Sequence, residues 1–423
     1  LTTTSTSASR IVYSQDFTGS GTTNDQFGHG THVAGIIAGN GAYTTGTYQK
    51  KNITGIAHSA NIINLKVLDA TGRGYDSNVI AAIDRAVALK ATYNIRVINL
   101  SLGRAPFDYY WNDPLCWAVE NAHFSGIVVV TSAGNQGRNN SGGNQGYGMI
   151  ASPGIDPWAI TVGAARTMLT TSRGDDAITT YSSKGPTLWE GNVKPDVVAP
   201  GNLMASARAV NSTIEKLIPA TIVPTSYYLT NGTTAAGNYL RLSGTSMATP
   251  VVAGTVALMI QKTPSLTPDV VKARIMRTAS KSMAAPGTNI DPGTLTTFPI
   301  YNDIFTVGAG YLDTLAALNS TLTGPGEAFS PWAWYDWGAN LIRVGGDSTL
   351  DIWYLSSASF SLTSVYGSSA LTSSSTAWTS PGSVLTNPNS GAFSIVWGDS
   401  IIWGDNVVWG DANLAQSLAN GDK

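Results

Sequence analysis

The heptapeptide GTSMATP, from Gly244 to Pro250, is the stretch that decides how this chain folds and what chemistry it can perform. Its small residues let the backbone turn tightly before the apolar run from Val251 to Ile260, which predicts a buried helix. The N-terminus of a helix favours negative charge that develops beside it. Ser246 therefore has the position of a nucleophile or, as the alternative, of an ordinary helix N-cap.

Two further segments favour the nucleophile. FGHGTHVAGIIAG, residues 27–39, places His29 directly before a predicted helix of small residues, and histidine is well suited to accept a hydroxyl proton near neutral pH. VVVTSAGN, residues 128–135, predicts a buried strand that ends in a turn, where the amide of Asn135 can donate to an oxyanion. Each segment alone has a structural explanation, but the three together indicate an acyl-transfer site.

From about Arg10 to about Leu318 the chain resembles the subtilisin-like serine peptidases. Besides the three motifs, the resemblance covers GIAHSANIINLKVLDATGRG (55–74), VINLSLG (97–103) and KPDVVAPG (194–201). It implies that His29, and not His32, is the general base, that Ser246 is the nucleophile and that Asn135 donates to the oxyanion.

The resemblance also implies how a substrate binds. Ser101, Leu102 and Gly103 would pair with the substrate backbone, and Ala133 with Gly134 would form the floor of the primary specificity pocket. Binding by strand addition is largely tolerant of sequence. We expect a serine endopeptidase that cleaves protein substrates through an acyl-enzyme, and the alternative is an impaired scaffold that binds peptides or surfaces without cleaving them.

The triad aspartate is the member of the constellation that we do not find. In the family it ends an apolar strand roughly thirty residues or more before the histidine, whereas only 28 residues precede His29 here. Asp16 and Asp25 are both close to His29 in sequence and have the pattern of solvated loop carboxylates. We therefore expect that an N-terminal segment or propeptide is missing and that the chain is a fragment or a processed form.

Composition narrows the function classes. The chain has 423 residues, of which 12% are charged, with a formal net charge of −2 and no basic cluster, which argues against a nucleic-acid partner. The lone cysteine, Cys116, rules out an internal disulfide framework and is expected to be a buried small hydrophobe. No apolar stretch reaches membrane-spanning length. The resemblance implies a secreted enzyme.

No cofactor is expected. The loop from Asn40 to Asn52, which often holds calcium in the family, contains no acidic residue here. Calcium binding by another pair of carboxylates, such as Asp175 and Asp176, is the alternative, although paired surface acids are usually only solvated. The four histidines lack the spacing of zinc ligands.

The pattern of elements predicts an α/β fold, a doubly wound and mostly parallel sheet with helices on both faces. Strands are expected at 62–67, 97–100, 127–131 and 159–162, and helices at 31–38, 78–91, 114–125, 247–262 and 267–278. Thr267 is the expected cap of the last helix, with Pro268 in its first turn. Residues 202–241 read as an insertion with a polar loop and one or two strands.

The chain changes character after the expected catalytic domain, residues 1–320. Residues 321–423 contain eight acidic residues against Arg343 and Lys423, and eight of the twelve tryptophans. We expect a Ser/Thr/Gly-rich linker or extension at 321–393, three WGD hexapeptide repeats at 394–411 and a tail at 412–423. The repeats SIVWGD, SIIWGD and NVVWGD predict short strands with tight turns, a small Trp-rich β-type extension. Such strands would dock on the catalytic domain, a partner or another copy, and carbohydrate binding through tryptophan is the alternative to simple packing.

Overall fold

The computed structural model describes residues 9–139, 145–284, 286–323, 328–336, 341–345, 365 and 407–409. Its centre is a five-stranded sheet in the order β4 (Val97–Leu100), β5 (Val128–Ser132), β6 (Ile160–Arg166) and β7 (Ala177–Ile178), with β8 (Val197–Pro200) also paired to β6. All of these pairings are parallel except that of β6 with β7. A second parallel pair, β1 (Ile11–Asp16) with β2 (Ile62–Lys66), stands apart from this sheet.

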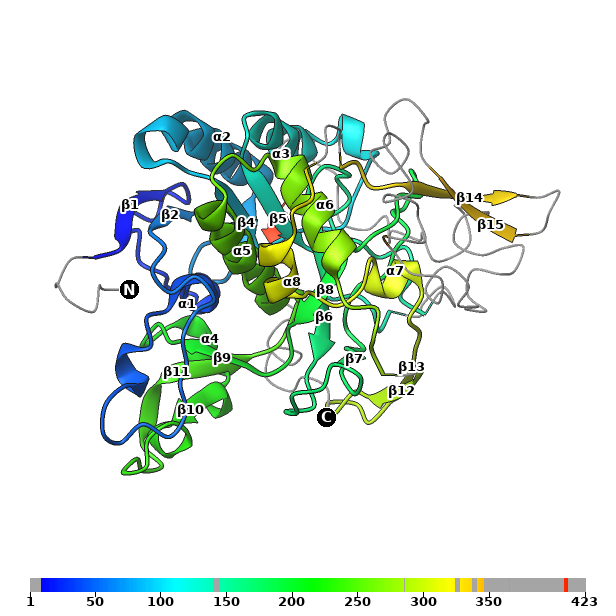
Figure 1. The fold of residues 1–423 in the computed structure, drawn as a ribbon. Helices are drawn as coiled ribbons and strands as arrows, with labels where there is room; N and C mark the ends of the chain where they lie inside the picture. Colours follow the sequence, from blue (N-terminus) through cyan, green and yellow to red (C-terminus); the bar gives the residue numbers. More distant parts are fainter. Residues whose placement is uncertain are drawn as a thin grey trace.

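Helices cover the two faces of the sheet (Figure 1). The helices α1 (His29–Ala38), α5 (Thr245–Lys262) and α6 (Pro268–Thr278) share one core with Val128 and Val130 of β5. The helices α2 (Asp76–Tyr93) and α3 (Pro114–Phe124) share the other core with Val129. Because successive strand residues point to opposite faces, the apolar run of β5 serves both cores, and the predicted α/β class is confirmed.

The element boundaries follow the sequence patterns closely. Thr267 caps α6, since its side chain accepts from the amide of Val270, and Pro268 is the first helical residue. Cys116 is fully buried, as expected for a small hydrophobe. The smaller helices are α4 (Thr213–Leu217), α7 (Ile304–Val307), α8 (Thr314–Asn319) and the 3₁₀ turns at Ala42–Thr44, Tyr110–Asn112, Pro219–Thr221 and Thr225–Tyr227.

The insertion is more structured than expected. It contains three strands, β9 (Met204–Ala207), β10 (Ile222–Pro224) and β11 (Ala236–Leu242), in an antiparallel sheet of order β10-β11-β9. The expectation of one or two strands was wrong because β9, with the sequence MASA, has little β propensity and forms through pairing with β11. His32 joins this sheet to α1, since its Nε2 lies 3.0 Å from the Met204 carbonyl and 3.2 Å from that of Leu240.

Two hairpins and a single short strand are among the described residues after α6. A hairpin pairs β12 (Gly287–Ile290) with β13 (Thr297–Ile300), and another pairs β14 (Trp332–Asp336) with β15 (Leu341–Gly345). The strand β16 (Val407–Trp409) belongs to the third WGD repeat and pairs antiparallel with β3 (Arg73–Tyr75). Val407–Trp409 therefore lies against residues 73–75, which belong to the expected catalytic domain, one of the three expected partners of the repeats. The other two repeats lie outside the described residues, and the division of the chain at residues 320, 393 and 411 stays a prediction.

A buried ionic cluster ties β8 to α6. Oδ2 of Asp196 accepts a hydrogen bond from Lys194 at 2.7 Å, and Oδ1 accepts one from Ser330 at 2.6 Å. Nζ of Lys272 lies 3.4 Å from the same Oδ1. Burial raises the pKa of Asp196, but the two lysines lower it more, so the net shift is downward. A charge that is buried in this way is stable only while its partners remain.

Candidate active site

Ser246 is the second residue of α5 and is almost fully buried, 2% exposed. Gly244 precedes the helix with φ 152° and ψ 162°, a conformation that only glycine adopts readily. The Ser246 hydroxyl lies 3.4 Å from the carbonyl oxygen of Ser101, to which it donates. The tight turn expected from GTSMATP thus brings Ser246 to the carboxyl end of β4.

His29 is the first residue of α1, the helix that packs against α5. Gly28 before it has φ 104°, and a Cβ atom there would lie 2.5 Å from the Ser212 hydroxyl. The ring of His29 is 3% exposed, and its Nε2 has no hydrogen-bond partner. Burial lowers the pKa of His29 to about 4, an effect that the charge of Asp25 partly opposes. The imidazole is therefore neutral at pH 7, as a general base must be.

Asn135 lies in the turn after β5 and is fastened to the start of α5. Its Oδ1 accepts from the amide of Thr245 at 2.9 Å and from the hydroxyl of Thr245 at 3.0 Å. The amide of Gly134 donates to the same hydroxyl at 3.2 Å. The side-chain amide of Asn135 is therefore held beside the turn that carries Ser246. Asn135 and Ser246 therefore lie at the carboxyl ends of β5 and β4, where open α/β sheets keep their sites, and His29 begins the helix that packs against α5.

The expected substrate-binding segments lie together at the same edge. Ser101, Leu102 and Gly103 follow β4, and Ala133 with Gly134 follows β5. Ala151 lies beside both glycines, because a Cβ atom on Gly103 or on Gly134 would come within 3.2 Å of its methyl group. Sequence reasoning missed Ala151, since its loop carries no motif.

A buried ionic network fixes the segment after Gly103, and sequence reasoning missed it too. Arg104 donates to Asp76 at 2.8 Å and to Asp113 at 2.6 Å, and Ser152 donates to Asp113 at 2.6 Å. These residues are separated by 9 to 39 positions along the chain, so no local sequence pattern predicts their contacts. Asp76 is also the residue that directly follows β3, so the network connects β3 to the substrate-binding segment.

Neither candidate for the triad aspartate hydrogen-bonds to His29. Asp16 accepts from the amides of Thr18 and Gly21 and from the hydroxyls of Thr18 and Ser20. Desolvation raises its pKa, but the four hydrogen bonds together lower it more, to about 2. Asp25 accepts from the amides of Gly28 at 2.7 Å and Thr31 at 2.6 Å. The Asp16 carboxylate therefore stabilises the loop that follows it, and the Asp25 carboxylate stabilises the start of α1.

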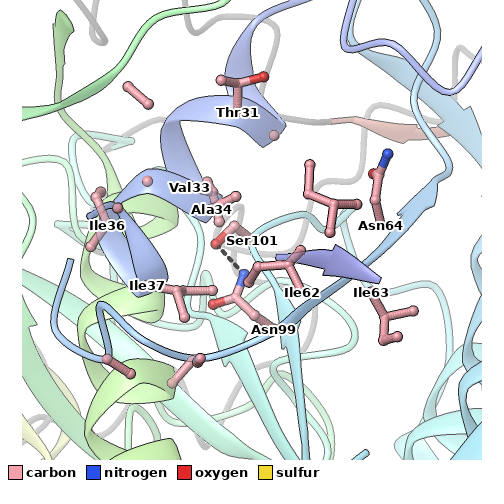
Figure 2. A pocket seen from close by; sticks show the side chains of 18 of the residues that line it. Thr31, Val33, Ala34, Ile36, Ile37, Ile62, Ile63, Asn64, Asn99 and Ser101 are labelled. Atoms are coloured by element: carbon pink, nitrogen blue, oxygen red, sulfur yellow. Dashed lines mark hydrogen bonds between the residues drawn. The ribbon is translucent and has the colours of Figure 1, made fainter. Parts of the chain in front are cut away.

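A large cavity separates β2 from β4. Each of these strands pairs on one side only, β2 with β1 and β4 with β5, within the described residues. The cavity between them measures about 1680 Å³, and both His29 and Ser101 line it. Figure 2 shows side chains from α1, β2 and β4 around this space: Val33, Ala34, Ile36, Ile37, Ile62, Ile63, Asn64 and Asn99. His29 and Ser101 therefore lie beside the space that separates the β1–β2 pair from the five-stranded sheet.

The described residues contain no group of three or more histidine, cysteine, aspartate or glutamate residues placed to hold a metal ion. None of their helices is both long and apolar enough to cross a membrane.

The fold, together with the serine, histidine and asparagine of the three motifs, is that of the subtilisin-like α/β proteins. The sequence model of the subtilase family matches residues 3–298, and the chain belongs to that family.

Individual relatives agree with this assignment. The chain is 39% identical over 257 residues to the serine protease AprX of Bacillus subtilis (strain 168), across 59% of this chain and 52% of AprX. It is 33% identical over 256 residues to subtilisin E of the same organism, across 60% of this chain and 51% of that protein. The solved structure of sphericase matches with a TM-score of 0.50 and 26% identity, across 70% of this chain and 82% of that one. The chain thus spans about half the length of these two curated relatives.

Proposed function

We propose that this protein is a serine endopeptidase that cleaves protein substrates through an acyl-enzyme. The observation that supports the proposal is the pair of links that fasten the start of α5, which carries Ser246, to Asn135 and to Ser101, while His29 begins the helix α1 that packs against α5. The family and its protease relatives support the same reaction.

In the proposed reaction the hydroxyl of Ser246 attacks the scissile carbonyl, and a ring nitrogen of His29 takes its proton. The side-chain amide of Asn135 donates to the oxyanion that forms. His29 then returns the proton to the leaving amine, which leaves the acyl group on Ser246, and water releases that group by the same steps in reverse. The substrate backbone adds as a strand along Ser101, Leu102 and Gly103, and its side chain enters the space near Ala133 and Gly134.

Three proposals about the setting of the enzyme follow from the resemblance. The protein acts outside the cell, as the resemblance to subtilisins suggests. The reaction needs no cofactor, because side chains can fill every role in it, so EDTA should leave the rate of the chemical step unchanged. A propeptide or further N-terminal segment is the third proposal, and expression of a longer chain from the source gene would test it.

The test is labelling with a fluorophosphonate probe, which reacts with activated serines. We expect slow labelling that is lost in Ser246→Ala and kept in Ser282→Ala, a control at an exposed serine. The rate should be low, since neither Asp16 nor Asp25 hydrogen-bonds to His29 and loss of the aspartate from the subtilisin triad lowers turnover by about 3 × 10⁴-fold. Protein that is folded by circular dichroism yet never labels at Ser246 would contradict the proposal and favour a binding function.

A further inference from the structure

We infer that Arg241 and the crevice beside it form a binding site for an acidic side chain of the substrate, glutamate or aspartate, on the leaving-group side of the cleaved bond. The crevice belongs to the insertion, residues 202–241, none of which takes part in the proposed reaction. The direction of the substrate rests on the proposed function, whereas the binding of a carboxylate at Arg241 does not.

The crevice is a small apolar hollow with one cation in its wall. It measures about 170 Å³, which is far more than one water molecule needs and is enough for one side chain. Arg241 lines it together with Thr221 and five apolar residues: Leu203, Ala220, Ile222, Val223 and Pro224. A group that fits both features has a short apolar stem and an anionic end, as the side chains of glutamate and aspartate have.

The guanidinium of Arg241 forms no hydrogen bond and no ion pair with the described residues. It is half-buried and lies against the ring of Tyr227, whose centroid is 4.8 Å from its Cζ. A contact with a ring face leaves the five N–H donors of a guanidinium without acceptors from the protein. A carboxylate matches paired guanidinium donors in geometry and in charge, so it is the group that this side chain binds best.

A second cation lies against the same ring. Nζ of Lys51 is 3.8 Å from the centroid of Tyr227, so Lys51 and Arg241 both contact this one side chain. Each contact is favourable by itself, but two like charges that are held at one ring repel each other. An anion beside them relieves this repulsion, which strengthens its binding in the crevice.

The nearby sequence does not supply the anion. The ranges 26–68 and 216–268, which contain both cations, have no aspartate or glutamate. Glu215 is the only acidic residue of the insertion, and its carboxylate pairs with Arg208. The counter-charge for Arg241 therefore comes from outside these segments, as it does when a ligand provides it.

Short connections join the crevice to the nucleophile. Arg241 is five residues before Ser246, so their Cα atoms lie at most about 18 Å apart. The amide of Leu203 donates to the hydroxyl of Ser243 at 2.8 Å, which fixes the wall of the crevice to the residue before Gly244. An extended peptide advances about 3.3 Å per residue, so an acid about two to five residues from the cleaved bond can reach Arg241.

The insertion lies beside the helix that carries the general base (Figure 1). Nε2 of His32 in α1 is 3.0 Å from the Met204 carbonyl, and the Ser206 hydroxyl donates to the His32 carbonyl at 2.8 Å. In the proposed reaction His29, at the start of α1, gives its proton to the leaving amine. The leaving-group half of the substrate therefore passes His29 and continues toward the insertion, while residues 101–103 bind the other half.

Matched decapeptides test the site through cleavage. Each is built from alanine and leucine and carries one glutamate, or one glutamine in its control, at one of the ten positions. Mass spectrometry locates the cleaved bond, and competition within a pair gives the ratio of the two kcat/KM values. We expect glutamate to raise kcat/KM about fivefold, as for a partly exposed ion pair, when it lies about two to five residues after the cleaved bond. Glutamate before the bond should have no such effect.

Single substitutions identify the cation that is responsible. Arg241→Gln should bring the ratio for glutamate over glutamine to about one, and Arg241→Lys should keep part of it because the charge remains. Lys262→Gln, at the exposed end of α5 and about 24 Å along the helix from Ser246, removes an equal charge and should keep the full ratio. An equal fall of the ratio in Lys262→Gln would show a general effect of charge and would overturn the inference.

Binding to the Ser246→Ala variant tests the site without cleavage. The probes are fluorescein-labelled decapeptides with glutamate or glutamine at the seventh position, and anisotropy measures their affinities. We expect the glutamate peptide to bind about fivefold more tightly, and the two affinities to become equal when Arg241→Gln is added. Equal affinities without that substitution would overturn the inference.

The outcomes separate the two proposals. Tighter binding of the glutamate peptide to a chain that cleaves nothing would support the carboxylate site and contradict the peptidase function. Cleavage with no preference for glutamate at any position would do the reverse. A preference confined to glutamate before the cleaved bond would overturn the placement of the site on the leaving-group side.

Discussion

Ser101 and Ser246 are joined by two hydrogen bonds that run in opposite directions. The Ser101 hydroxyl donates to the Ser246 carbonyl at 2.9 Å, and the Ser246 hydroxyl donates to the Ser101 carbonyl at 3.4 Å. The first bond fixes the start of α5 to the end of β4. The second bond is long. In the proposed reaction the Ser246 hydroxyl must give up this bond before it can donate its proton to His29.

This relationship predicts a modest effect of Ser101→Ala. The variant keeps the carbonyl that accepts from Ser246 but loses the hydroxyl, so we expect a loss of about 1 kcal/mol in the free energy of unfolding. Labelling of Ser246 should slow by less than about tenfold, because the Ser246 hydroxyl itself is untouched. Urea unfolding and labelling kinetics check the two numbers, and a complete loss of labelling would mean that Ser101 has a direct part in the reaction.

Asn135→Ala should slow hydrolysis far more than it destabilises the fold. Loss of one oxyanion donor lowers kcat by about 10²–10³-fold in this kind of reaction. Asn135 also accepts from Thr245, so the comparison is Thr245→Val, which removes the hydroxyl partner but keeps the donor amide of Asn135. Equal loss of kcat in both variants would show that Asn135 acts by positioning the turn and not by donating to the oxyanion.

The burial of His29 predicts an unusual pH profile. Its pKa of about 4 means that the neutral, proton-accepting form dominates above that pH, so the rate of Ser246 labelling should rise around pH 4 and stay flat from about pH 5 to 8. A carboxylate bound beside the ring would favour the charged form and move this rise to higher pH. A rise centred near pH 6.5 without any added carboxylate would contradict the buried, unpaired state of the ring.

The same shift makes stability depend on pH. Because the pKa of His29 is lower in the folded chain than its ordinary value of 6.5, the unfolded chain binds the proton more readily between these values. The His29 contribution is thus fully present above about pH 6.5 and is lost as the pH falls toward 4. His29→Gln should flatten this part of the curve, while His32, with a pKa lowered by burial to about 3, keeps its own share.

Asp196→Asn should destabilise the fold strongly. The substitution removes the charge that pairs with the two buried lysines, Lys194 and Lys272, and breaking a buried pair on one side costs about 3–5 kcal/mol. Asp175→Asn, where the half-buried carboxylate accepts hydrogen bonds from Thr170, is the control and should change the free energy of unfolding by less than about 0.5 kcal/mol. Chemical denaturation at pH 7 measures both.

The sequence predicts the core of the candidate site because each of its motifs is local. A serine at a small-residue turn, a histidine before a helix and an asparagine after a strand are each readable within a dozen residues. The contacts that hold them are not local: Arg104 with Asp76 and Asp113, or His32 with the carbonyls of β9 and β11, join distant segments. The same holds for β9, whose sequence is neutral and whose strand exists because β11 lies beside it.

The pairing of β16 with β3 limits what else can bind there. One edge of a strand has a single row of amides and carbonyls, so an extended peptide that adds to this edge of β3 must first displace Val407–Trp409. Asp76, directly after β3, is bonded to Arg104, which follows the expected substrate-binding residues 101–103, so this ion pair links β3 to that segment. The chain's own C-terminal region therefore competes with incoming peptides at an effective concentration that dilution cannot lower.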